Sequence, residues 1–597
     1  MGPTLQRGDL IVLGPRASRP AHSLFVRVSR GPQNTIGRTA MTATYQVLVD
    51  DMKAMGIGQV FGLMSDDTAV FATALDNSGI RLYGARHENN AIAMAEGYSY
   101  ATGGLGVAVI GRGPATANGL HAATYASRSG SKVLIISGEA AVPSGAVNTL
   151  GPDYKGFNAV GVLGAAGIRT FVASSPDTAR GALADAAAAA MQGGAAALLL
   201  PVNVQLADMD LAKAPPPAGL KPPRPPAAPR PQAIEAAAAL LRQSRKPLIL
   251  AGLGAHRAGA KAEIEQLADR IGALLATSAR GKDMFRGHPA NLGIVGSFSH
   301  SAARRLIDQA DCVLVFGAGL NILTMSFGNS LPKVPLIQVD AERSHIGRWY
   351  PADVAVAGDA KLAAQALLDA LPPGSNADRP FRSEETLKFL ADFDIARDFE
   401  PANTPRTVDP RALGVALEKL LPPCRNLVYD AGNFLGIVPY LSVPGPGYFK
   451  FTSDFASIGL GFGTALGVAK ARPDETTVLV IGDGGFLMTM GELETVVRED
   501  LPLVIVLMND CAYGAELHFL KMRELPVAKS VFPDVDYAPI AEAFGFQATT
   551  VRTLDDLAKL APLLAKPEGP IFLDCKLNAA VAAPFMSEFH EFETRKH

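Results

Sequence analysis

The chain has 597 residues, of which 48% are hydrophobic and 19% are charged. This composition is that of a globular protein, and the length predicts about three or four domains because it exceeds what a single hydrophobic core supports. With 55 basic and 57 acidic residues the net charge is only −2, which argues against a nucleic-acid or membrane-surface partner, since either would favour a basic excess.

The first forty residues differ from the rest of the chain. They contain six arginines and a single acidic residue, Asp9. Such a segment is typical of an organelle transit peptide, or of upstream sequence read from a wrong start codon, because Met41 opens a natural first helix. We favour the second interpretation and a cytoplasmic location, and we expect residues 1–40 to lie outside the fold. The four scattered cysteines form no CxxC pair, which fits a reducing compartment.

Two proline-rich stretches divide the remainder of the chain. The first covers residues 214–231, and a looser one covers residues 372–410. Proline removes a backbone donor and disfavours helices and central strands, so both stretches are typical of linkers. The predicted domains and linkers are 41–205, 206–231 (linker), 232–372, 373–407 (linker) and 408–590.

Each predicted domain alternates short, continuously apolar runs with longer amphipathic or alanine-rich runs. Examples are Gly106–Ile110 in the first domain, residues 247–252 in the second and residues 503–508 in the third. Continuous apolar strands separated by helices are typical of parallel sheets covered on both faces. The sequence therefore predicts three parallel-sheet α/β domains, with ligands at the carboxyl ends of the strands.

An acidic residue stands at the start of an alanine-rich helical run in the first domain. Residues 84–91 read GARHENNA and follow a short strand-like run. Taken alone, Glu88 is a first-turn acid of the kind that the helix dipole favours. Its functional interpretation depends on the third domain.

The third domain places an acid among glycines directly after a predicted strand. Asp483 stands between Gly482 and the pair Gly484 and Gly485. Glycines let backbone N–H groups approach a phosphate closely, and an acid among them needs a cation such as Mg²⁺ between itself and the phosphate. A second apolar strand ends 27 residues later at Asp510. Adjacent parallel strands would bring both acids to one edge of the sheet.

This spacing of GDG and a following Asn-Asp pair resembles the diphosphate-and-magnesium motif of thiamine-diphosphate (ThDP) enzymes. The similar branch is that of acetolactate synthase, the 2-oxo acid decarboxylases and the 2-hydroxyacyl lyases. The segment around Glu88 resembles the R-H-E-x-x-A signature of the same family. The resemblance covers about 41–590 and implies a pyrimidine-binding domain, a central Rossmann-like domain and a domain that binds the diphosphate and Mg²⁺.

The resemblance implies a role for each of these acids. Asp483, Asp510 and the carbonyl of Ala512 would hold Mg²⁺, although most relatives have Asn where this chain has Asp510. Glu88 would share a proton with the aminopyrimidine ring of the cofactor, and so let the cofactor's own amine deprotonate its thiazolium carbon.

Further cofactor contacts follow from the same resemblance. Asn433 would donate to the diphosphate. Ile458 would wedge between the two rings of the cofactor, unless it is an ordinary core residue. The remaining predicted cofactor-binding residues are Gly482, Gly484, Gly485, Tyr513 and Gly514.

Three polar side chains are expected to contact the substrate or to lie close to it. Lys155 falls where relatives that join two oxo acids often have Gln, and it would hold a carboxylate or phosphate unless it is a solvated surface lysine. On the helix after Gly514, Glu516 and His518 suggest a polar substrate, and His518 is predicted as a catalytic proton relay. The alternative for both is an exposed helix face.

The central domain departs from flavin-binding relatives. Residues 319–323 read GLNIL where those relatives carry an Arg-Phe-Asp-Asp-Arg-like stretch, and residues 296–298 read GSF in place of their Met-His-Gly turn. These departures argue against bound FAD. A vestigial or CoA-type nucleotide cleft stays open, because a short G-x-G such as residues 252–254 is weak evidence of a nucleotide site.

The predicted function is that of a ThDP- and Mg²⁺-dependent lyase or carboligase acting on a 2-oxo acid, by decarboxylation with or without acyloin formation. The first alternative is an acyloin or 2-hydroxyacyl-CoA lyase, and the alternative from another class is a non-catalytic ThDP-fold binding protein. A nicotinamide dehydrogenase is disfavoured, because we find no full G-x-G-x-x-G motif with a distal acid. The resemblance also implies a homodimer or homotetramer, in which the cofactor lies between the first domain of one chain and the third domain of its partner.

Overall fold

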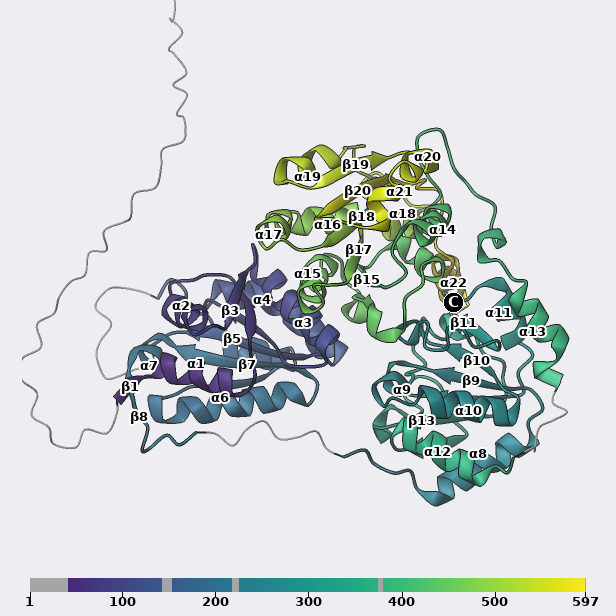
Figure 1. The fold of residues 1–597 in the computed structure, drawn as a ribbon, viewed down its shortest axis with the longest axis horizontal. Helices are drawn as coiled ribbons and strands as arrows, with labels where there is room; N and C mark the ends of the chain where they lie inside the picture. Colours follow the sequence, from purple (N-terminus) through teal and green to yellow (C-terminus); the bar gives the residue numbers. More distant parts are fainter. Residues whose placement is uncertain (1–40, 142–152, 217–224, 374–379, 596–597) are drawn as a thin grey trace, which may run out of the picture.

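Three six-stranded parallel sheets organise the chain (Figure 1). The computed structural model describes residues 41–141, 153–216, 225–373 and 380–595. Within these ranges each predicted domain contains one of the three sheets, so the predicted fold of three parallel-sheet α/β domains is confirmed. The leader at 1–40 lies outside the described residues. No helix in the described ranges is long and apolar enough to cross a membrane.

The N-terminal domain is built on the sheet β3-β2-β4-β5-β7-β6. Its strands are β2 (Gln59–Gly62), β3 (Arg81–Gly84), β4 (Gly106–Ile110), β5 (Lys132–Glu139), β6 (Arg169–Val172) and β7 (Gly194–Pro201). Its helices are α1 (Thr44–Ala54), α2 (Ala69–Asn77), α3 (Glu88–Thr102), α4 (Pro114–Ser129), α5 (Ala159–Ala165), α6 (Pro176–Met191) and α7 (Val202–Leu206). A short antiparallel ribbon of β1 (Met41–Ala43) and β8 (Asp208–Asp210) joins the two ends of this domain.

The central domain is built on the sheet β11-β10-β9-β12-β13-β14. Its strands are β9 (Pro247–Ala251), β10 (Leu274–Thr277), β11 (Asn291–Ile294), β12 (Cys312–Phe316), β13 (Leu336–Asp340) and β14 (Val354–Ala357). Its helices are α8 (Pro231–Gln243), α9 (Leu253–Arg257), α10 (Lys261–Ile271), α11 (Ser301–Ile307) and α12 (Ala360–Ala370), with short 3-10 helices η1 (Ala279–Gly281), η2 (Ser326–Gly328) and η3 (Arg343–His345). The predicted linker at 373–407 contains a helix, α13 (Glu384–Ala391), between η4 (Pro380–Arg382) and η5 (Ile395–Arg397).

The C-terminal domain is built on the sheet β16-β15-β17-β18-β20-β19. Its strands are β15 (Arg425–Tyr429), β16 (Phe449–Phe451), β17 (Thr476–Gly482), β18 (Leu503–Asn509), β19 (Gln547–Val551) and β20 (Ile571–Lys576). Its helices are α14 (Pro410–Leu420), α15 (Gly461–Ala471), α16 (Asp483–Thr489), α17 (Glu492–Arg498), α18 (Gly514–Met522), α19 (Ala538–Phe544), α20 (Leu554–Ala558), α21 (Ala561–Ala565), α22 (Pro584–Thr594), η6 (Asn433–Tyr440), η7 (Pro446–Tyr448) and η8 (Ser453–Phe455).

The C-terminal domain packs on both of the others (Figure 1). Its helix α15 crosses α3 of the N-terminal domain so closely that a Cβ atom at Gly97 would lie 2.0 Å from the Thr464 carbonyl oxygen. On the other side, α22 reaches the central domain, where Phe589 packs on Phe327 with ring centroids 5.4 Å apart. One continuous hydrophobic cluster therefore joins the N-terminal and C-terminal domains, and a second includes residues of the central domain.

Candidate active site

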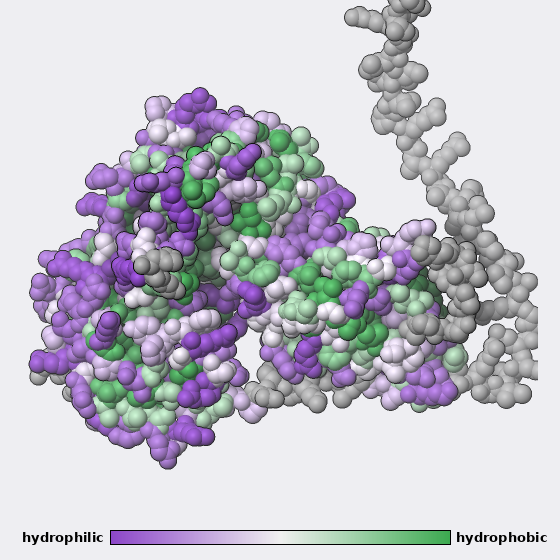
Figure 2. Space-filling view, turned by 180° about the vertical axis from the view of Figure 1, so that it is seen from behind, coloured by the Kyte–Doolittle hydropathy of each residue, from purple (hydrophilic) through white to green (hydrophobic). Residues whose placement is uncertain are grey.

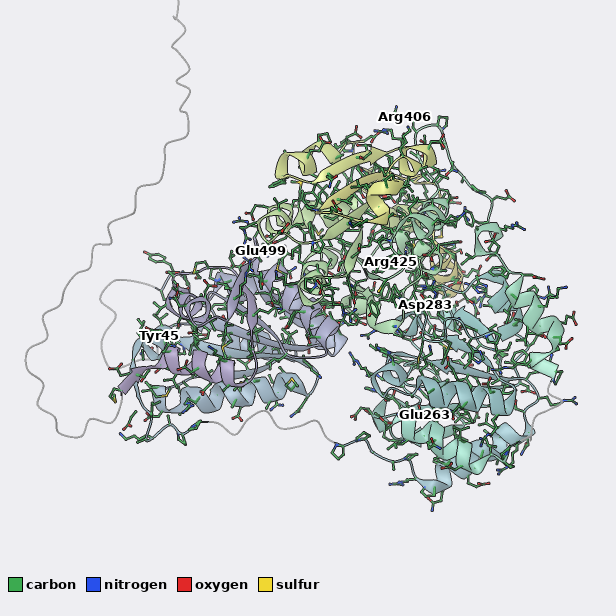
Figure 3. The ribbon with its side chains drawn as sticks, in the orientation of Figure 1. Tyr45, Glu263, Asp283, Arg406, Arg425 and Glu499 are labelled. Carbon is green, nitrogen blue, oxygen red and sulfur yellow. The ribbon has the colours of Figure 1, made fainter. Side chains whose placement is uncertain are left out.

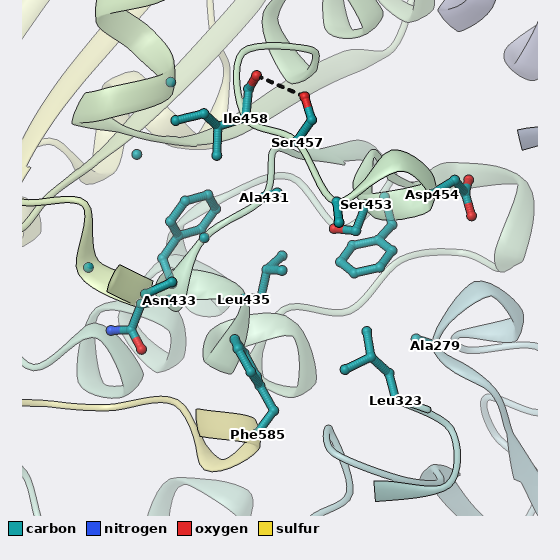
Figure 4. Close-up of a pocket in the computed structure, with 18 of the residues that line it drawn as sticks. Ala279, Leu323, Ala431, Asn433, Leu435, Ser453, Asp454, Ser457, Ile458 and Phe585 are labelled. Carbon is teal, nitrogen blue, oxygen red and sulfur yellow. Dashed lines mark hydrogen bonds between the residues drawn. The ribbon is translucent and has the colours of Figure 1, made fainter. Parts of the chain in front are cut away.

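A cavity of about 1170 Å³ lies between the C-terminal and central domains. Figure 4 shows the side chains of Ile458, Asn433 and Leu323 around it, with Phe585 of α22 close by. Among the described lining residues, the N-terminal domain contributes only His121. The cavity lies where the strands of both sheets end, which is where parallel α/β sheets bind their ligands.

Asp483 and Asp510 meet at the carboxyl edge of the C-terminal sheet. Strands β17 and β18 are adjacent and parallel, with Gly482 level with Met508. Asp483 begins α16 directly after β17, and Asp510 follows the end of β18. Both carboxylates line the cavity, so the structure brings together the two side chains that the sequence predicts as metal ligands.

Asp483 is buried and Asp510 is half-buried, and neither carboxylate has a basic partner within the described ranges. Burial and the neighbouring Asp510 carboxylate raise the pKa of Asp483 to about 8, and burial raises the pKa of Asp510 to about 7. Hydrogen bonds from the Ala512 backbone lower both values in part. In the part of the chain that the structure describes, no Lys, Arg or His forms an ion pair with either carboxylate. A bound cation would favour the charged form of both.

The donor set suits Mg²⁺ bound together with a phosphate. No group of three or more His, Cys, Asp or Glu side chains that could hold a metal occurs among the described residues. The protein atoms that could coordinate a metal here are the two carboxylates and the carbonyl oxygen of Ala512. Mg²⁺ prefers an octahedron of oxygens and commonly uses one or two carboxylates with substrate phosphates, so the arrangement fits the predicted pair of metal and diphosphate.

Glycines form the cavity wall beside the two acids. A Cβ atom would lie 2.7 Å from the Tyr513 ring at Gly484, 2.4 Å from Asp430 Oδ2 at Gly485 and 2.3 Å from Asp510 Oδ2 at Gly514. A side chain at any of the three would displace a neighbouring residue, so only glycine fits. The predicted cofactor-binding residues that line the cavity are Asn433, Ile458, Gly482, Gly484, Gly485, Tyr513 and Gly514.

Asn433 uses its side chain to hold the C-terminal segment. Its Nδ2 donates to the Val581 carbonyl at 2.9 Å, and its Oδ1 accepts from the Ala583 N–H at 2.8 Å. One N–H of the amide stays available for the predicted diphosphate contact. Asn433 therefore connects the cavity wall to the segment that leads into α22 and Phe585.

His518 lies beside the cavity wall but does not line the cavity. It is buried and hydrogen-bonds to the backbone of Val581, while its Nε2 has no partner among the described residues. Burial lowers its pKa. Glu516, two residues earlier on α18, does line the cavity and has no hydrogen-bond or ion-pair partner among the described residues. The catalytic role of His518 stays a prediction, and the geometry favours Glu516 for contact with a ligand.

A buried acid that we did not select from the sequence positions Ile458. Asp430 accepts from the backbone N–H groups of Gly459 at 2.7 Å and Gly461 at 3.1 Å. Its complete burial raises its pKa, although these hydrogen bonds oppose the shift. Asp430 thus fixes the backbone that follows Ile458. An acid directly after an apolar strand and before Ala431 and Gly432 is the sequence signal that could have identified it.

Glu88 stands at the first position of α3 and does not line the cavity of its own chain. Its side chain is half-buried and accepts a hydrogen bond from Nδ2 of Asn118 at 3.1 Å. It lies at the carboxyl edge of the N-terminal sheet, because β3 ends four residues earlier. One chain therefore holds the two predicted halves of the site at separate places.

Lys155 is neutralised by neighbouring acids. Its Nζ forms ion pairs with Asp66 and, at 2.8 Å, with Asp67. The hydrogen bonds that Lys155 donates to these two carboxylates raise its pKa. Arg112, which also pairs with Asp67 at 2.8 Å, belongs to the same cluster. A role of Lys155 in holding a substrate anion stays a prediction, and it would require release from these partners.

Two further lining residues carry no motif in the sequence. Arg280 of η1 lines the cavity and pairs with Asp454 at 3.3 Å. Phe585 comes from α22, near the C-terminal end of the described chain, and packs edge-on against Phe298 with centroids 6.1 Å apart. Only the packing of the central and C-terminal domains brings these residues to the cavity.

Three family models match successive parts of the chain. The N-terminal TPP binding domain of thiamine pyrophosphate enzymes matches residues 42–156, their central domain matches residues 234–367, and their C-terminal TPP binding domain matches residues 430–575. These matches follow the order of the three sheets. Together they cover most of the described chain.

Relatives match over nearly the whole length. A probable acetolactate synthase large subunit of Methanocaldococcus jannaschii is 27% identical over 557 residues, which cover 91% of this chain and 93% of the relative. A sulfoacetaldehyde acetyltransferase of Rhodobacter capsulatus is 29% identical over 581 residues, covering 91% and 95%. An acetolactate synthase of Arthrospira platensis is 25% identical over 550 residues, covering 89% and 93%.

Proposed function

The chain belongs to the thiamine pyrophosphate enzyme family, and we propose that it uses ThDP and Mg²⁺ to make or break a carbon–carbon bond next to a carbonyl, with a 2-oxo acid as substrate. The observation that carries this proposal is the pair of Asp483, which is buried, and Asp510, which is half-buried, in a glycine-lined cavity where neither has a basic partner among the described residues. Two such carboxylates are costly to keep charged unless a cation binds there.

The protein's own groups have separate tasks in this proposal. Asp483, Asp510 and the Ala512 carbonyl would hold Mg²⁺, and the backbone N–H groups at Gly484 and Gly485 would receive the diphosphate. When bound, ThDP supplies the carbon chemistry. Glu88 would hold a proton at the nitrogen of the aminopyrimidine ring. The apolar wall around Ile458 would exclude water from the reacting atoms.

The site requires a second copy of the chain. Glu88 does not line the cavity that contains Asp483, so a complete site would take Glu88 from a partner, in a homodimer or a homotetramer. Beside Asp483, Leu487 and Met488 of α16 are 45% and 60% exposed. The N-terminal domain also presents apolar surface in Figure 2, and Tyr154, next to Lys155, is 90% exposed. Exposed apolar side chains at both halves support their burial against each other.

Cavity size favours a second candidate, an acyloin or 2-hydroxyacyl-CoA lyase. The cavity extends from Asp483 to the central-domain loop around Leu323. Its volume of about 1170 Å³ is larger than that of ordinary ligand pockets, which measure roughly 300–1,000 Å³. Such space accommodates a larger substrate than a small oxo acid. The names of the relatives, acetolactate synthase and sulfoacetaldehyde acetyltransferase, instead support transfer of a two-carbon acetyl unit. A non-catalytic ThDP-fold protein would have no need of Glu88 together with both metal acids.

A product screen tests the proposed reaction. The protein is incubated with ThDP, Mg²⁺ and a panel of 2-oxo acids, acyloins and 2-hydroxyacyl thioesters, and products are identified by mass spectrometry. We expect loss of carbon dioxide or formation of a 2-hydroxy ketone from at least one oxo acid, abolished in Asp483→Ala. Cleavage confined to acyloins or thioesters would replace the oxo-acid proposal by the alternative. Turnover that persists without ThDP and Mg²⁺ would contradict both.

A further inference from the structure

The start of helix α3 is held by the C-terminal domain of the same chain. Glu492, the first residue of α17, is completely buried. One of its carboxylate oxygens accepts from the backbone N–H of Arg86 at 2.8 Å and from Nδ2 of Asn90 at 2.9 Å. These donors lie two positions before and two positions after Glu88. A single buried carboxylate therefore holds the backbone on both sides of Glu88, the predicted activating acid.

The contacts of Glu492 differ from those of its charged neighbours. Its other carboxylate oxygen accepts from the Thr495 hydroxyl at 2.7 Å, and no Lys, Arg or His pairs with it among the described residues. The Arg86 side chain pairs instead with Glu494, which is partly exposed. Burying a carboxylate is unfavourable unless hydrogen bonds satisfy it, and here two of the three donors belong to the segment around Glu88.

The position of Glu492 in the chain connects it to the metal site. Helix α16 begins at Asp483 and α17 follows after Met490 and Gly491. The segment that carries a metal ligand at its first residue thus reaches the start of α3 only nine positions later. Since Glu88 does not line the cavity of its own chain, the two ends of this segment belong to different sites in the proposed dimer.

We propose that Glu492 is a positioning residue for Glu88. By fixing the Arg86 N–H and the Asn90 side chain, it sets the backbone from which Glu88 extends toward the partner's cofactor. The proposal rests on the proposed function, in which Glu88 is the activating acid. It assigns to Glu492 no contact with substrate or cofactor, and its effect passes through Glu88 alone.

A double-mutant cycle on cofactor activation tests this directly. The readout is exchange of the hydrogen on the thiazolium carbon of bound ThDP with deuterium, which needs no substrate and is measured by NMR after acid quench. Glu492→Ala is expected to slow this exchange about 10- to 100-fold, the effect of a misplaced catalytic group. In a Glu88→Gln background the same change should cost nothing more, because interacting residues are non-additive. Additive losses would overturn the proposal.

Conservative and matched variants exclude a general loss of structure. Glu492→Gln keeps an oxygen that accepts from Arg86 and Asn90, so exchange should stay within about threefold of wild type. Glu499→Gln is the control, because Glu499, labelled in Figure 3, also joins the two domains, by an ion pair with Arg81 at 3.0 Å. Glu499 makes no direct contact with the segment around Glu88 and reaches its first residue only through Arg498. This variant should leave exchange within about twofold, as expected for a partly exposed pair. An equal loss in Glu499→Gln would overturn the specific role of Glu492.

A second measurement uses the protein without cofactor. Amide hydrogen–deuterium exchange of peptides covering residues 84–91, followed by mass spectrometry, should accelerate at least about tenfold in Glu492→Ala, because the Arg86 N–H loses its acceptor. If Glu492→Ala does not fold, Asn90→Ala removes the partner from the opposite side and should slow ThDP activation in the same direction. Unchanged peptide exchange would contradict the proposal. If Glu88→Gln itself activates ThDP normally, the proposed function fails, whereas a normal Glu492→Ala beside an inactive Glu88→Gln defeats this inference alone.

Discussion

Asp510 is the residue at which this chain departs most clearly from the common magnesium motif. The motif that this segment resembles commonly has a neutral Asn at this position, whereas here a second carboxylate stands beside Asp483. At about 4 Å and an effective dielectric of about 20, one pair of unit charges is worth roughly 4 kcal/mol before opposing terms cancel. The second carboxylate attracts Mg²⁺ and repels the diphosphate, so the net effect on the ternary complex should be small.

We therefore predict different outcomes for two substitutions of Asp510. Asp510→Asn should change ThDP affinity in the presence of Mg²⁺ by no more than about tenfold, or 1.4 kcal/mol, because an amide oxygen still coordinates the metal. Asp510→Ala removes the ligand and should cost far more. ThDP without Mg²⁺ should bind the wild type hardly at all, and better in the Asn variant, because the repelling charge is gone.

Titration of ThDP by calorimetry, with and without Mg²⁺, measures all three proteins. Asp483→Ala provides the reference for complete loss of the metal site. An Asn variant as weak as the Ala variant would show that Asp510 has a role other than metal binding.

The roles of single side chains were predictable where they depended on strand ends. Asp483 and Asp510 each follow an apolar strand, and parallel pairing of the two strands is enough to bring them together. His518 and Glu516 show the limit of this reasoning. They lie two positions apart on α18, so they point in different directions around the helix, and only the packing of α18 decides which of them reaches the cavity.

At the scale of elements, the crossing of α3 and α15 depends on small residues. A Cβ atom at Gly97 would lie 2.0 Å from the Thr464 carbonyl oxygen, and one at Gly467 would lie 2.0 Å from the Met94 carbonyl oxygen. A side chain at either glycine would therefore require one of the two helices to move. This crossing places Glu88, at the start of α3, relative to the C-terminal domain.

Gly97→Ala is therefore expected to lower the free energy of unfolding by about 1–3 kcal/mol, the range for overpacking in a core. Gly181→Ala is the matched control, because Gly181 also lies inside a helix, α6, and a Cβ atom there would meet no heavy atom within 4 Å beyond its own helix. This control should stabilise the protein by about 0.5–1 kcal/mol, since glycine weakens a helix interior. Chemical denaturation of both variants checks the pair, and a stable Gly97→Ala protein would disprove the close crossing.

Elements with strong periodicity were predictable, and elements that act through tertiary contacts were not. The strand predicted at Gly106–Ile110 has the same bounds in the structure, because continuous apolar runs have few alternatives. The role of α22 was not predictable. Its residues contact Phe298 and Phe327 of the central domain, more than 250 positions away, and nothing local in its sequence indicates that Phe585 reaches the cavity.

Within the whole molecule, the central domain is the part where flavin-binding relatives would hold FAD, which we expect to be absent here. The loops after β9 and β12 pack on one another, with the Gly254 N–H donating to the Gly317 carbonyl at 3.0 Å. A Cβ atom at Gly252 would lie 2.4 Å from the same carbonyl oxygen. These glycines serve contact between the loops, so they do not argue for a bound nucleotide.

We predict that the purified protein carries no stoichiometric flavin. The measurement is the absorbance spectrum of the native protein and of the supernatant after denaturation, referred to protein concentration. The acetolactate synthase relatives make this test informative, because flavin-binding members of that branch carry the stretch that residues 319–323 lack. A yellow preparation with close to one flavin per chain would contradict the prediction.

We propose that each site combines Glu88 of one copy with Asp483 of another, and complementation between inactive variants distinguishes this arrangement from a site within one chain. Glu88→Gln and Asp483→Asn are each expected to be inactive, but a hybrid of the two contains one site with both residues intact. Co-refolded in equal amounts, the variants should recover about one quarter of wild-type ThDP activation, because about half of randomly formed two-fold dimers are hybrids with one good site of two. Activity that stays at the level of the separate variants, in samples where hybrid dimers are shown to form, would mean that both residues come from the same chain and would contradict the shared site.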